Sequence, residues 1–81
     1  MTIYINMNKQ ELKNELQTEL RWINEAIAVK ENPTINIDAL RYKCPKKHQK
    51  YVSKDYLHSI TVDELEQHRS RIREDIYTLD N

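Results

Sequence analysis

The chain of 81 residues contains no glycine. Glycine is the residue that takes positive φ without steric penalty and lets backbone approach a ligand closely. The phosphate-binding loops of dinucleotide-binding and P-loop enzymes depend on it. The sequence therefore excludes those enzyme classes, and it predicts a chain whose helices begin at capping side chains and end near proline.

Two segments carry the signals of a helix start. Asn8 precedes Glu11 by three residues, and Thr61 precedes Glu64 by the same interval. In each case apolar residues flank the pair at the positions of a hydrophobic staple. A cap followed three residues later by glutamate is a capping box, so both sites predict strong helix N-termini.

Apolar residues recur with helical periodicity after both caps, which predicts helices over about residues 8–31 and 61–80. The first helix should stop at Asn32, because Pro33 disfavours helical dihedrals there and asparagine is the best available substitute for a terminating glycine. We expect the two helices to pack antiparallel, with the residue numbers of facing positions adding up to about 91 or 92. A parallel return stays possible, since the connection is about thirty residues long.

Arg69 interrupts the apolar seam of the second helix. The expected register places it opposite Trp22, with Glu19 one turn away. We predict that Arg69 is partnered by Glu19, Trp22 or a tyrosine hydroxyl, because a cation in a seam needs a compensating group.

The remaining segments carry weaker signals. Residues 2–7 and 34–37 alternate as short strands would, which allows a minor N-terminal β-ribbon, and residues 38–43 and 53–59 can form short helices. The predicted fold is all-α: one domain over residues 1–81, built as an antiparallel helical hairpin joined by an irregular basic segment with short helices.

A chain of this size is at the limit of what one hydrophobic core can stabilise. Cys44 is the only cysteine, so an intrachain disulfide is excluded. We therefore expect a homo-oligomer, most simply a homodimer. The sequence shows no leader and no apolar run of membrane-spanning length, and it predicts a cytoplasmic protein without membrane association.

The formal net charge is zero, but the charges are segregated. From residue 41 to residue 54 the chain carries six cations and no acid, while the parts before and after it are both net acidic. We name residues 41–56 the basic segment. Its candidate contact residues are cationic or aromatic: Arg41, Tyr42, Lys43, Lys46, Lys47, Lys50, Tyr51 and Lys54.

Trp22 and Val29 lie to one side of the main apolar stripe of the first helix. They form a second apolar patch. Either the middle of the chain or the N-terminal residues cover this patch, or it contacts a partner, since tryptophan is enriched at binding hot spots.

The residues that could carry chemistry are few. Cys44, His48, His58 and His68 are ligand types suited to zinc, but only the interval from Cys44 to His48 is a usable spacing. Cys44 lacks an assembled general base and oxyanion site. We predict no metal, no cofactor and no catalytic residue.

The sequence favours a non-enzymatic protein-binding module, a small regulator or inhibitor of a larger protein or complex, of a kind that a phage or plasmid encodes. The alternative is a nucleic-acid-binding protein that uses the basic segment, because cations interleaved with tyrosines suit phosphates and stacked bases. A helix-turn-helix is disfavoured, since the second helix would present acidic residues to DNA.

Overall fold

The structure is a computed structural model that describes residues 8–80. Within this range the chain is helical apart from short connections. The elements are α1 (Lys9–Glu31), α2 (Ile37–Lys43), the 3₁₀ helix η2 (Lys46–Val52), α3 (Lys54–Ser59) and α4 (Val62–Asp80).

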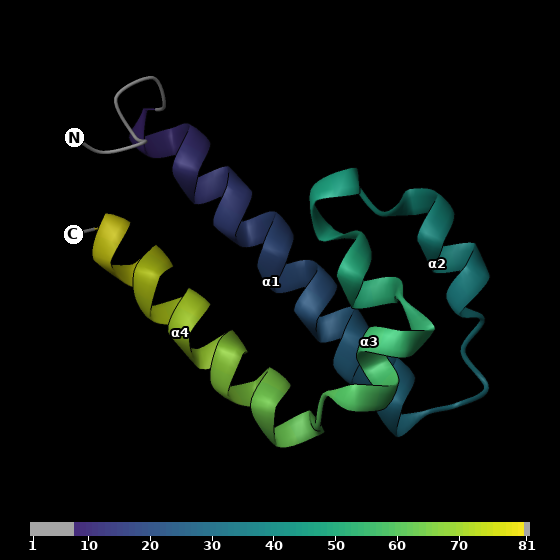
Figure 1. Cartoon of the computed structure of the whole chain (residues 1–81). Helices are drawn as coiled ribbons and strands as arrows, with labels where there is room; N and C mark the ends of the chain where they lie inside the picture. Colours follow the sequence, from purple (N-terminus) through teal and green to yellow (C-terminus); the bar gives the residue numbers. More distant parts are fainter. Residues whose placement is uncertain (1–7, 81) are drawn as a thin grey trace.

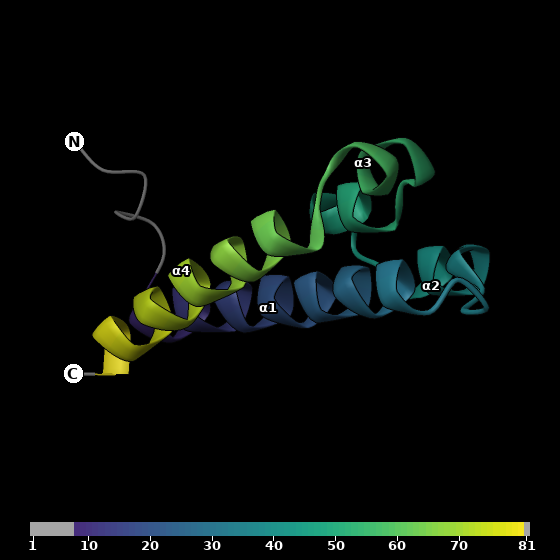
Figure 2. The ribbon, with the colours of Figure 1, turned by 90° about the horizontal axis from the view of Figure 1, so that it is seen from below.

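Helices α1 and α4 lie side by side and run antiparallel (Figures 1 and 2). Lys13 Nζ lies 2.5 Å from the Asp80 carboxylate, and Arg69 Nη1 donates to Asn24 Oδ1 at 3.1 Å. In both pairs the residue numbers add up to 93, within one or two of the expected register. The prediction of a helical hairpin is confirmed, and these contacts show its direction.

Both predicted capping boxes are present. The side chain of Asn8 accepts a hydrogen bond from the Glu11 amide at 2.8 Å and donates to its carboxylate at 3.0 Å. Thr61 Oγ1 accepts from the Glu64 amide at 3.0 Å, while the Glu64 carboxylate accepts from the Thr61 amide at 3.0 Å. The helices begin within one residue of the predicted positions because these interactions are local.

Asn32 was expected to replace a helix-terminating glycine, which takes positive φ, and the structure differs. This residue has φ of −133°, which is extended backbone, and no residue between 8 and 80 has positive φ. The following proline holds Asn32 in the extended region. Its side-chain oxygen instead accepts from the amide and hydroxyl of Thr34, at 3.2 and 2.6 Å, and so closes the turn.

The middle of the chain folds back onto α1 rather than forming a loose connection. Figure 2 shows α3 and η2 stacked beside the part of the hairpin where α1 ends and α4 begins, which we name the closed half. Helices α2 and α3 each pack against η2 (Figure 1). The largest fully buried side chains all lie in or against this half: Trp22, Tyr51, Ile23, Leu65 and Val52.

The expected β-ribbon is wrong for the part that the structure describes. Residues 34–37 form a turn and the start of α2, and Asn36 caps this helix by accepting from the Asp38 amide at 3.0 Å. Asparagine at this position satisfies the first helical amides, so the local cap prevails over a short strand. The other half of the ribbon, residues 2–7, lies outside the described residues.

Across residues 8–80, none of the helices has the length and apolar character needed to cross a lipid bilayer.

Candidate protein-binding surface

The basic segment is anchored by the residues at its centre. Tyr51 and Val52 are fully buried, and the Tyr51 hydroxyl donates a 2.7 Å hydrogen bond to the Glu19 carboxylate on α1. The ring of Tyr51 also meets that of Tyr56 edge-on, with centroids 5.9 Å apart. These contacts hold η2 in a fixed position against α1.

Burial and the Glu19 carboxylate both act on the Tyr51 phenol. Burial is the larger effect, and both raise the pKa of Tyr51 far above its ordinary value. His68 Nε2 approaches the same carboxylate at 3.8 Å. Glu19 therefore fastens η2 to α1 through the Tyr51 hydrogen bond, and Tyr51 stays protonated as a structural hydrogen-bond donor.

Three of the cations of the basic segment make structural contacts. Arg41 donates to the Val52 carbonyl at 3.1 Å, and Lys47 forms a 3.1 Å ion pair with Glu15 on α1. Lys50 Nζ lies 5.1 Å from the centroid of the Tyr51 ring, within cation–π distance. These side chains fasten the basic segment to its neighbours while most of them keep contact with solvent.

Tyr42 is the most exposed large hydrophobic side chain among residues 8–80, at 93% exposure. It lies on α2 between Arg41 and Lys43 and lines a shallow depression together with Asp38 and Arg41. Lys43, Lys46 and Lys54 are exposed as well. Tyr42 therefore presents an aromatic ring to solvent next to Arg41 and Lys43, while Asp38 pairs with Arg41 at 3.0 Å beside it.

Two predicted contact residues are not on the surface. Trp22 is 1% exposed and Tyr51 0%. The middle of the chain covers Trp22, which is the first of the two alternatives for its patch. Sequence periodicity could not decide this, because burial of a residue at the side of a helix depends on which other element packs there.

Val29 is half-buried. It lines a groove at the closed end of the hairpin, together with other apolar residues, two lysines and a histidine. The lining residues are Val29, Lys30, Pro33, Ile35, Ile37, Lys54, Leu57 and His58. This groove extends the exposed basic surface with apolar area.

Arg69 has other partners than the predicted ones. It binds Asn24 and lies 3.7 Å from Glu66, while the cation over the Trp22 ring is Arg21, at 5.2 Å from the centroid. Glu19 is engaged by Tyr51 instead. The difference follows from η2, whose tyrosine reaches the carboxylate that the sequence assigned to Arg69.

The four candidate zinc ligands are dispersed. Burial raises the pKa of the Cys44 thiol, and His48 is buried next to the Tyr51 ring. His68 faces Glu19, and His58 lies at the closed-end groove. Among residues 8–80, no three side chains of His, Cys, Asp or Glu are grouped so that they could hold a metal ion.

The 3₁₀ helix η2 was not predicted, although the sequence contains a signal for it in the spacing of two residues. His48 and Tyr51 are three residues apart, the interval at which side chains share one face of a 3₁₀ helix, and both are buried. The helix starts directly after Pro45, whose carbonyl accepts from the His48 amide at 2.9 Å.

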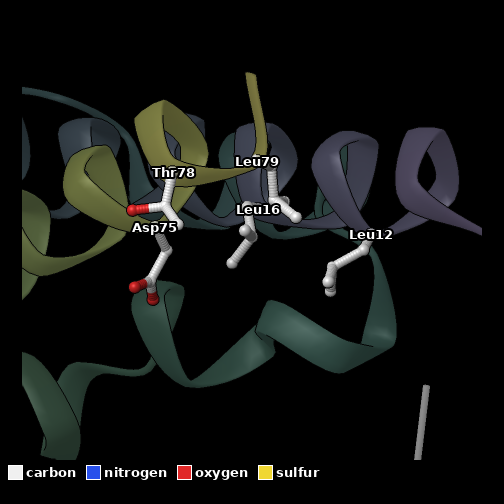
Figure 3. Close-up of a pocket in the computed structure, with 5 residues that line it drawn as sticks. All are labelled: Leu12, Leu16, Asp75, Thr78 and Leu79. Atoms are coloured by element: carbon white, nitrogen blue, oxygen red, sulfur yellow. The ribbon is translucent and has the colours of Figure 1, made fainter. Parts of the chain in front are cut away.

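A second groove lies at the opposite end of the hairpin, where α1 begins and α4 ends, which we name the open half. It has a volume of about 250 Å³ and is lined by Leu12, Leu16, Asp75, Thr78 and Leu79. Figure 3 shows the side chains of Leu12, Leu16 and Asp75 extending to the same side of the two helices. Leucines form its floor, and one carboxylate marks its rim.

Comparisons of this chain with protein-family models, with curated proteins and with solved structures find no match. The surfaces themselves therefore carry the functional argument.

Proposed function

We propose that this chain is a non-enzymatic protein-binding module, a small regulator or inhibitor of a larger protein, and that it contacts an acidic partner through α2 and the exposed lysines. The observation that carries the proposal is the exposure of Tyr42 among cations. Tyrosine and arginine dominate binding hot spots, and an exposed ring contributes most of its energy when a partner covers it. Charge complementarity then selects an acidic surface.

The groups that could serve catalysis support a non-enzymatic role. The Tyr51 hydroxyl is committed to Glu19, and its raised pKa keeps it protonated. The raised pKa of Cys44 disfavours the thiolate that a nucleophile requires. These side chains stabilise the fold rather than present reactive atoms.

Nucleic-acid binding is the second candidate, and the exposed lysines favour it. Stacking on bases requires accessible aromatic faces, however, and Tyr51 is buried while Tyr56 is partly buried against it. One fully exposed tyrosine remains on the basic segment. This loss of stacking surface favours a protein partner.

The first test is to capture partners from an extract of the native host with the tagged chain, with and without nuclease. The captured protein is then titrated with the chain and its variants to measure their affinities. We expect capture to survive nuclease and Tyr42→Ala to weaken binding about tenfold or more. The triple substitution of Lys43, Lys46 and Lys54 by alanine should also weaken it. These lysines are preferable to Lys47 and Lys50, whose contacts support the fold.

The matched control is Tyr77→Ala, which removes the other strongly exposed tyrosine among residues 8–80, on α4. It should bind as the unchanged chain does. Equal effects of the Tyr42 and Tyr77 substitutions would contradict the proposed surface, and loss of the captured species after nuclease would favour the nucleic-acid alternative.

A further inference from the structure

The groove at the closed end of the hairpin combines apolar area with positive charge. Its lining residues come from the end of α1, the turn that follows it, the start of α2, and α3 (Figure 1). Five of them are apolar, two are lysines and one is a histidine, and none is acidic. We propose that this closed-end groove binds a short segment of the acidic partner in which apolar side chains are flanked by Asp or Glu, an inference that rests on the proposed function.

Ile35 lies in this groove without being part of the core. Val29 and Ile37 pack against the buried core, and Leu57 belongs to it. Ile35 is half-exposed and, among residues 8–80, is in neither group. The rest of its apolar surface leaves water only when another molecule covers it, and that burial favours binding.

Local hydrogen bonds fix the walls of the groove. The Ile35 amide donates to the Asn32 carbonyl at 3.1 Å, and the Asn32 side chain accepts from the Thr34 amide at 3.2 Å. Lys30 Nζ donates to the Leu57 carbonyl, which ties α3 to the end of α1. The groove is therefore formed before a peptide binds, and this lowers the conformational cost of association.

The basic side chains at the groove have no acidic partner within residues 8–80. Lys30, Lys54 and His58 are absent from the ion pairs of this range. The acids next to them in sequence, Glu31 and Asp55, are exposed and do not line the groove. A carboxylate of the partner meets these cations without displacing an existing ion pair. Charge complementarity thus selects an acidic segment over a basic one.

The size and place of the groove suit a peptide segment. Its volume is about 310 Å³, at the lower end of the range of about 300 to 1,000 Å³ for ligand pockets, so it accommodates a few side chains. Ile37 lines the groove at the start of α2, the helix that carries Tyr42. One partner can therefore cover Tyr42 and fill the groove together.

Selection of peptides from a random library on the folded, full-length chain tests this inference. The enriched peptides should combine large apolar residues with Asp or Glu. A labelled enriched peptide is then titrated with the chain and its variants by fluorescence anisotropy. Ile35→Ser and Lys54→Glu should each weaken its binding about tenfold or more, because the first removes apolar contact and the second reverses a charge.

Matched control variants lie in the open half. Leu79→Ser removes a half-exposed apolar side chain, and Lys9→Glu reverses an exposed charge. Both should bind the peptide as the unchanged chain does. A peptide whose acids are replaced by lysine should reverse the order and bind Lys54→Glu more tightly than the unchanged chain. Circular dichroism checks that the variants stay folded, as expected for positions outside the core cluster.

A selection that enriches no peptide, or only peptides without acidic residues, would overturn the inference. Equal binding of the enriched peptide to Ile35→Ser and the unchanged chain would overturn it as well.

Titration of the captured protein separates this inference from the proposed function. If Tyr42→Ala weakens binding of that protein and Ile35→Ser does not, the surface on α2 is supported and the groove is wrong. If Ile35→Ser weakens it and Tyr42→Ala does not, the groove is supported and the surface around Tyr42 is wrong.

Discussion

At the scale of single residues, Glu19 fastens η2 to α1. Its carboxylate accepts a hydrogen bond from the Tyr51 hydroxyl, and His68 on α4 lies 3.8 Å from the same oxygen. A hydrogen bond to a charged group is stronger than one between neutral groups, and Tyr51 is fully buried. The Tyr51 hydroxyl should therefore contribute measurably to the free energy of unfolding.

Tyr51→Phe should lower the free energy of unfolding by about 1 to 2 kcal/mol, because it removes the donor and leaves the carboxylate without it. Urea unfolding measures this directly. Tyr42→Phe is the matched control, since the same hydroxyl is lost from a side chain that is 93% exposed, and it should change stability by less than about 0.5 kcal/mol. Equal effects of the two substitutions would contradict the role of Tyr51.

The raised pKa of Tyr51 also predicts a pH dependence. The folded state holds the phenolic proton that the unfolded state releases near its ordinary pKa of 10. The stabilisation is therefore complete below about pH 10 and falls by about 1.4 kcal/mol per pH unit above it. The stability difference between the unchanged chain and Tyr51→Phe should shrink by about 1 kcal/mol between about pH 10 and pH 11, because the unfolded phenol is already half ionised at pH 10. A difference that stays constant over this range would mean that Tyr51 ionises normally when folded.

At the scale of elements, the helix boundaries follow from local chemistry. The chain begins its α-helices with side-chain caps, and Thr61 accepts a hydrogen bond from an amide in the first turn of α4. Thr61→Ala should destabilise the protein by about 1 kcal/mol. Ser70→Ala, which removes a hydroxyl from the exposed interior of the same helix, should leave stability unchanged or slightly raise it. Thermal unfolding of both variants compares them, and equal melting temperatures would argue against the cap.

The difference between local and long-range interactions explains which parts of the structure the sequence predicts. Caps and periodicity act over three or four residues, and they predict α1, α3 and α4 within one residue of their ends. The positions of Trp22 and Tyr51 depend on how the basic segment folds across α1, a contact between residues about thirty apart in sequence. No local pattern specifies such a contact, so the sequence placed both residues on the contact surface and missed the partner of Glu19.

At the scale of the whole molecule, the structure shows how the basic segment is attached and which of its cations stay exposed. The basic segment is bound to α1 through Lys47 and Glu15, and through Tyr51 and Glu19. This arrangement compensates some of its cations and leaves Lys43, Lys46, Lys54 and Tyr42 facing solvent. The exposed surface is smaller than the sequence suggests, and it lies on elements held in place by the core.

The central claim is that residues 46–57 form a packed part of the core rather than a solvated connection. Amide hydrogen exchange tests it most directly. The amides of His48, Ser53 and Leu57 donate to backbone carbonyls at 2.9 to 3.1 Å, beside fully buried side chains. They should exchange at least about a hundredfold more slowly than in an unfolded chain. Exchange of these amides at unfolded-chain rates, while those of α1 and α4 stay protected, would contradict the account.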